Sequence, residues 1–147
     1  MQQRFTDENK LMSDFFGEVW VHCSTCNKKA IATVSFETQT ASLHCTQCGL
    51  YKRISTEITL LGSKGHWQLP ANRYFDAELW LMMPFKAEVF FAYNGQHLAY
   101  LEKYISATLR EHKDRTHFTL LEKLPKFYHE AKNRKGLLKI IEKLSKK

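Results

Sequence analysis

Four cysteines in two close pairs form the pattern in this chain that is best suited to chemistry. Cys23-Ser-Thr-Cys26 and Cys45-Thr-Gln-Cys48 each hold two residues between their thiols, and eighteen residues separate the pairs. A two-residue gap lets both sulfurs of a pair point inward from one tight turn, a knuckle, and a closed structural zinc site takes four thiolates in a tetrahedron. The spacing therefore predicts one structural zinc ion held by Cys23, Cys26, Cys45 and Cys48.

The residues between the pairs must carry the chain out and back, so that the second knuckle meets the first. Apolar and polar residues alternate over 31–37 and again over 41–44, with a polar turn between them, which predicts a β-hairpin. A third alternating run over 53–60 predicts a three-stranded antiparallel arrangement. Gly49 follows the last cysteine, where a knuckle commonly needs a positive φ.

With these motifs, residues 20–61 resemble the zinc-ribbon family found in transcription factors, ribosomal proteins and many small bacterial proteins. The resemblance covers about a third of the chain. It implies a structural metal and leaves the function open.

Other uses of the cysteines fit the pattern less well. A thioredoxin-type redox site needs one pair at a strand-to-helix junction, whereas two pairs bracket a hairpin here. Catalytic zinc keeps an open coordination position, and four cysteines fill the shell. His22 and His44 each precede a cysteine and are alternative ligands, but we expect them to face away from the metal.

Beyond the ribbon, the patterns predict a mainly helical chain with one further hairpin. We expect an α+β fold with a helical C-terminal half, divided into an N-terminal helix plus ribbon (1–61) and a hairpin and helical region (62–147). The expected elements are a helix over 1–18, a loop over 62–72, a hairpin over 77–93 that turns at Pro84, a helix from Asn94 to about Arg115, another helix that begins at 119–122, and two helical pieces in 126–146 around Gly136.

The positive charge of the chain is concentrated at its C-terminal end. Residues 123–147 hold nine basic and two acidic residues, so that this tail carries the whole net charge of +7. A cationic stripe suits a phosphate backbone, and the candidate nucleic-acid contacts are Lys132, Arg134, Lys135, Lys139 and Lys143. The same pattern also describes a docked amphipathic helix with lysines on its wet face. Phe127 and Tyr128 could stack on bases, but their helical context favours the core.

The sequence shows no known catalytic motif, which favours a binding protein over an enzyme and suggests no small-molecule substrate. Its first residues have no apolar stretch and its longest apolar run is too short to span a bilayer, so we expect a soluble cytoplasmic protein without membrane contact. We expect a nucleic-acid-binding adaptor that uses the basic C-terminal helices. The alternative is a protein-interaction module, such as a bacterial immunity or antitoxin protein that blocks a partner toxin.

Overall fold

The computed structural model describes residues 4–5, 12–106, 109–110 and 124–147. Most of the elements in this part of the chain are β-strands, and its two α-helices are α1 (Gly95–Ser106) and α3 (Arg134–Ser145). The predicted α+β class with a helical C-terminal half is therefore wrong.

The chain divides into two compact units. We name residues 15–81 the ribbon unit, and residues 82–147 together with 1–14 the C-terminal unit. The expected division after residue 61 into separate domains stays a prediction.

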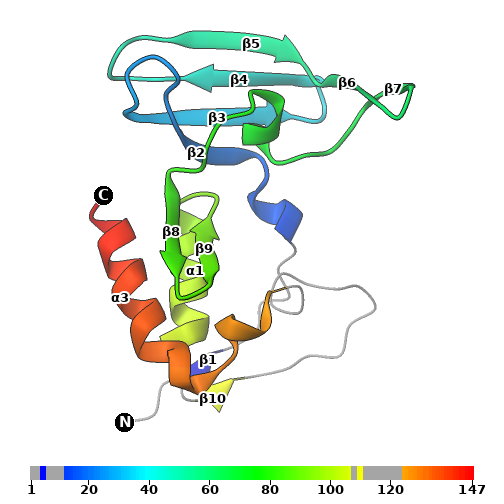
Figure 1. Ribbon diagram of the computed structural model, residues 1–147. Helices are drawn as coiled ribbons and strands as arrows, with labels where there is room; N and C mark the ends of the chain where they lie inside the picture. Colours follow the sequence, from blue (N-terminus) through cyan, green and yellow to red (C-terminus); the bar gives the residue numbers. More distant parts are fainter. Residues whose placement is uncertain (1–3, 6–11, 107–108, 111–123) are drawn as a thin grey trace. The chain divides into compact units, whose positions relative to one another are not determined.

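A four-stranded antiparallel sheet forms the ribbon unit (Figure 1). Its strands pair in chain order: β2 (Glu18–His22), β3 (Lys29–Ser35), β4 (Thr40–His44) and β5 (Tyr51–Ser55). One cysteine pair lies in the connection from β2 to β3 and the other in the connection from β4 to β5. Because neighbouring strands run in opposite directions, these two connections lie at the same end of the sheet.

One face of this sheet forms the core of the ribbon unit. Side chains of a strand point alternately to opposite faces, and six of those on the inner face are at most 2% exposed: Val19, Val21, Ala30, Ala32, Ala41 and Leu43. The 3-10 helix η2 (Ala71–Tyr74) packs against β2, β3 and β4. We name the opposite face, which carries Trp20, Ile31, His44 and Tyr51, the open face.

The predicted helix over residues 1–18 is wrong for the part that the structure describes. Arg4–Phe5 forms strand β1, which pairs in parallel with β10 (Leu109–Arg110), and Met12–Phe15 forms the short 3-10 helix η1. The backbone carbonyls of Phe16 and Gly17 accept the N–H groups of Ala71 at 3.1 Å and Val34 at 3.0 Å, so this stretch bonds to the rest of the ribbon unit. A helix of this length is marginal on its own, so tertiary contacts decide its conformation.

The ribbon unit contains one more sheet strand than the three predicted. The missed strand is β2, although Val19 and Val21 alternate there with Trp20 and His22. Beyond β2, the backbone N–H of Trp80 donates to the carbonyl of Trp20 at 2.9 Å, so that segment 78–80 continues the sheet on that side.

The third predicted strand run, 53–60, is divided between two sheets. β5 ends at Ser55, and β6 (Glu57–Leu60) pairs with β7 (Ser63–His66) instead. Thr56 lies between the two strands, is 1% exposed, and bonds His66 Nδ1 through its hydroxyl at 2.9 Å. The segment predicted as a loop after Gly62 therefore begins with a strand.

The C-terminal unit combines the hairpin β8–β9 with helices α1 and α3 (Figure 1). β8 (Leu81–Phe85) begins at the end of the ribbon unit and pairs with β9 (Glu88–Ala92); after α1 come the 3-10 helices η3 (Lys126–Tyr128) and η4 (Ala131–Asn133), then α3. Helix α1 packs against both α3 and β9. Ring contacts help to close this core, with centroids 5.8 Å apart for Phe85 and Phe127 and 5.4 Å for Phe90 and Tyr128.

Three predictions for the C-terminal unit are wrong in detail. The hairpin is present, but Pro84 lies inside β8 and the turn falls at residues 86–87, where Lys86 has a φ of 53°. Gly136 lies inside α3 and does not divide it. The helix expected from Asn94 to Arg115 ends at Ser106.

Asn94 caps α1 at the predicted start of the helix, because its side-chain oxygen accepts the backbone N–H of His97 at 2.9 Å. The helix expected from 119–122 lies outside the described residues.

Candidate metal centre

The two cysteine knuckles have the same backbone geometry. In the first, Cys23 N–H donates to the carbonyl of Lys28 at 2.8 Å, and the carbonyl of Cys23 accepts the N–H of Asn27 at 2.9 Å. In the second, Cys45 makes the equivalent bonds to Leu50 and Gly49, both at 2.9 Å. Each knuckle is thus a turn that is closed by two backbone hydrogen bonds.

The residue after each second cysteine has a positive φ, 60° for Asn27 and 79° for Gly49. The prediction for Gly49 is confirmed. Asn27 occupies the equivalent position in the first knuckle and was missed, although asparagine is among the few residues with a Cβ that adopt this conformation readily.

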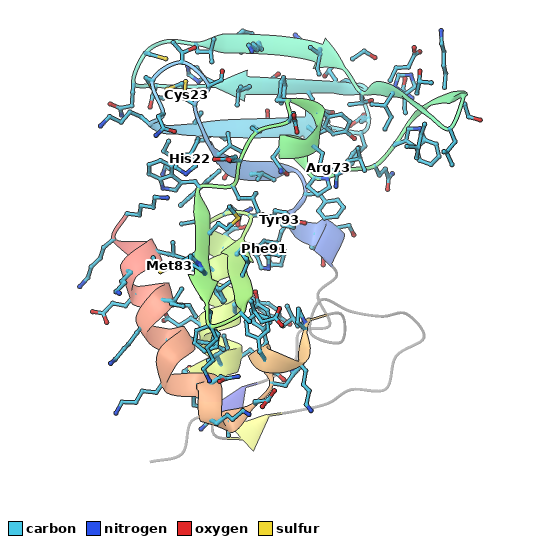
Figure 2. The ribbon with its side chains drawn as sticks, viewed as in Figure 1. His22, Cys23, Arg73, Met83, Phe91 and Tyr93 are labelled. Carbon is cyan, nitrogen blue, oxygen red and sulfur yellow. The ribbon has the colours of Figure 1, made fainter. Side chains whose placement is uncertain are left out.

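The four sulfur atoms lie together at one end of the sheet, where Figure 2 labels Cys23. All of the Sγ atoms are within 4.8 Å of one another, and Cys23–Cys48 and Cys26–Cys45 are each 3.6 Å apart. Four sulfurs bound at 2.3 Å to one tetrahedral zinc ion are about 3.8 Å apart. The 3.6 Å separations are also far longer than the bond of a disulfide, and all four cysteines are free. The residues therefore fit a single tetrahedral metal ion.

The protein environment favours the charged form of one thiol. The backbone N–H of Cys26 lowers the pKa of Cys23 to about 6, against the opposing effect of burial. Cys23 is then a thiolate at neutral pH, which is the form that binds a metal.

His22 and His44 do not join the sulfur cluster, which within the described part of the chain consists of cysteines alone. The ring of His22 lies 4.7 Å from that of Trp80, and the ring of His44 lies 6.2 Å from that of Tyr51. These contacts agree with the expectation that both histidines face away from the metal.

The predicted nucleic-acid contacts lie on and just before α3. The inner side of this helix is buried, through Leu137, Ile140, Ile141 and Leu144. Lys132, Lys135, Lys139 and Lys143 are exposed, whereas Arg134 is half-buried. Phe127 and Tyr128 are 8% and 3% exposed, so they belong to the core as expected.

In comparisons with known proteins, the chain matches no protein-family model, no curated protein and no solved structure. The fold and the site define a protein with a four-cysteine cluster, compatible with a zinc ion, at the end of an antiparallel sheet. None of the helices in the described residues is long and apolar enough to cross a membrane.

Proposed function

We propose that the protein is a non-enzymatic zinc-ribbon protein that binds nucleic acid, with one structural zinc ion held by Cys23, Cys26, Cys45 and Cys48. The four sulfurs within 4.8 Å of one another support the metal. Four thiolates fill the coordination shell and leave no position for a substrate, so the zinc stabilises the ribbon and takes no part in a reaction.

The arrangement of α3 supports the nucleic-acid part of this proposal. Lys135, Lys139 and Lys143 follow one another at four-residue spacing, which aligns them along one exposed side of the helix. Glu130 and Glu142 are the acidic residues of this region, and they pair with Lys132 and Lys146, each at 3.1 Å. The three aligned lysines have no ion-pair partner among the described residues, so their charge is available to phosphates.

Charge reversal on α3 tests this proposal in the zinc-loaded full chain. We expect Lys135→Glu, Lys139→Glu and Lys143→Glu together to weaken binding to DNA and RNA by roughly tenfold or more, and to flatten the salt dependence, because fewer counterions are released. Binding would be measured by fluorescence anisotropy with labelled oligonucleotides at several salt concentrations.

A matched pair of single variants distinguishes the effect of the α3 lysines on binding from the effect of the net charge of the protein. Lys139→Glu and Lys64→Glu change the net charge equally, and both lysines are exposed, but Lys64 lies on β7 in the ribbon unit. We expect Lys139→Glu to weaken binding more. Equal effects of the two variants, or no binding by the native protein at low salt, would contradict the nucleic-acid proposal and direct attention to a protein partner.

A further inference from the structure

Large side chains form a cross-strand row on the open face of the ribbon sheet. The strand register places Trp20 opposite Ile31, Ile31 opposite His44, and His44 opposite Tyr51, so that each of the four strands contributes one residue. With strands about 4.8 Å apart, the row spans about 14 Å. Trp20 and Ile31 are half-buried, His44 is exposed, and Tyr51 is 59% exposed.

The aromatic side chains of the sheet strands lie on the open face, whereas aromatic side chains are usually on the buried face. The buried face carries alanine, valine and leucine, whereas the tryptophan and the tyrosine of these strands lie on the open face. Aromatic rings normally contribute most to the stability of a protein when they are buried. Accessible rings in one row therefore indicate a surface that is completed by a ligand.

Cationic groups accompany the rings. Lys29 Nζ lies 3.8 Å from the centroid of the Trp20 ring, and Arg53 is exposed two residues after Tyr51, on the same face. Glu18 also lies on this face, and its carboxylate accepts the indole N–H of Trp20 at 3.3 Å. The face thus offers flat rings with positive charge beside them.

We infer that the open face binds single-stranded nucleic acid, with an unpaired base stacked on Tyr51 and phosphates near Arg53 and Lys29. Stacking uses the faces of bases, which a duplex keeps covered by neighbouring base pairs, and it tolerates any sequence because every base has such a face. The inference rests on the proposed nucleic-acid-binding function and adds to it a preference for unpaired strands.

The test compares native and variant full-length protein, loaded with zinc, on single-stranded DNA, single-stranded RNA and duplex DNA of about a dozen nucleotides. We expect Tyr51→Ala to weaken binding to both single strands by roughly five- to a hundredfold, the range for loss of one stacked base, and to leave duplex binding unchanged. Tyr51→Phe keeps the ring and should retain the native affinity.

Trp67→Ala is the matched control, because Trp67 is an exposed aromatic residue of the same unit, 40% exposed, that lies outside the four strands of the sheet. It should not alter single-strand affinity. Equal affinity of Tyr51→Ala and native protein for single strands would overturn the inference, and so would an equal loss on single strands and duplex.

The α3 variants show which proposal has failed. If Tyr51→Ala has no effect while the triple lysine variant loses binding to all nucleic acids, the stacking surface is wrong and the function stands. If only Tyr51→Ala weakens binding, the stacking surface stands and the assignment of phosphate contacts to α3 is wrong. If the native protein binds none of the three, both are overturned.

Discussion

Asn27 and Gly49 occupy the same backbone position in the two knuckles. Comparing them indicates which substitutions Gly49 can accept. A Cβ built on Gly49 meets no atom within 4 Å, so steric room is not the constraint there. The constraint is the φ of 79°, which disfavours residues that carry a Cβ. Asn27 shows that asparagine is accommodated at this position.

We therefore expect Gly49→Ala to destabilise the ribbon unit by about 1 kcal/mol, from backbone conformation alone. Gly49→Asn should be destabilised less, because it reproduces the residue of the first knuckle. Thermal unfolding followed by tryptophan emission would measure both changes. Equal stability of Gly49→Ala and the native protein would show that this knuckle does not need a left-handed residue.

His97 is a residue whose protonation bears on the stability of the C-terminal unit. Its side chain is 1% exposed, and its Nδ1 accepts the backbone N–H of Tyr93 at 2.9 Å. Burial lowers the pKa of His97 from its ordinary value of 6.5 to about 4. The unfolded chain then takes up a proton at a higher pH than the folded chain does.

Because the folded pKa is the lower one, the contribution of neutral His97 is complete above pH 6.5 and is lost as the pH falls toward 4. The expected loss is about 3 kcal/mol across this window. Chemical denaturation of the native protein and of His97→Gln, measured at several pH values, isolates the effect. The variant should lose less stability on acidification, and parallel curves would contradict the assignment.

At the scale of the elements, Gly136 explains how α3 lies so close to Phe85 of the hairpin. A Cβ at this position would meet Cε2 of Phe85 at 2.8 Å, and Phe85 is itself stacked on Phe127. The glycine weakens the helix locally, but it permits this close approach.

We expect Gly136→Ala to destabilise the C-terminal unit by about 1 kcal/mol, since the steric conflict with a packed ring outweighs the better helix propensity of alanine. Gly17→Ala is the control, because a Cβ at Gly17 meets nothing within 4 Å and its φ is not positive. Helix ellipticity during thermal unfolding would report on the first variant. A stabilised Gly136→Ala protein would show that the ring moves aside at little cost.

The elements near the cysteines could largely be predicted from the sequence, because alternation and the knuckle spacing point to the same hairpin. Strand β2 carries the same alternation and has the same length as β4, but it lies outside the stretch between the two cysteine pairs and was missed. By contrast, β7 contains Ser63 and Gly65, which resemble a loop, and its strand conformation depends on pairing with β6. Such pairing depends on residues that lie apart in sequence, so local patterns could not predict it.

The sequence was also a poor guide to the helices. The apolar spacing in residues 11–16 matches a helix, but the hydrogen bond from Ala71 to Phe16 belongs to the tertiary fold. Gly136 suggested a break in a helix because its local propensity is low, whereas its close contact with Phe85 became visible only in three dimensions. The open-face row could likewise not be recognised before the register of all four strands was known.

At the scale of the whole molecule, the two units carry different spectroscopic signals. The three tryptophans of the chain, Trp20, Trp67 and Trp80, all belong to the ribbon unit. Both α-helices of the described residues, α1 and α3, belong to the C-terminal unit. Tryptophan emission therefore reports on the ribbon, and the helical ellipticity near 222 nm reports mainly on the other unit.

The most direct test of the central claim is removal of zinc with a chelator, followed by metal content, tryptophan emission and helical ellipticity on one sample. A structural zinc site predicts about one zinc per chain before treatment and, as the metal leaves, a red shift of tryptophan emission with most of the helical signal retained. Cys45→Ser should show the zinc-free emission from the start. Purified protein that contains no zinc would contradict the account. A ribbon unit whose tryptophan emission is unchanged after all zinc has been removed would also contradict it.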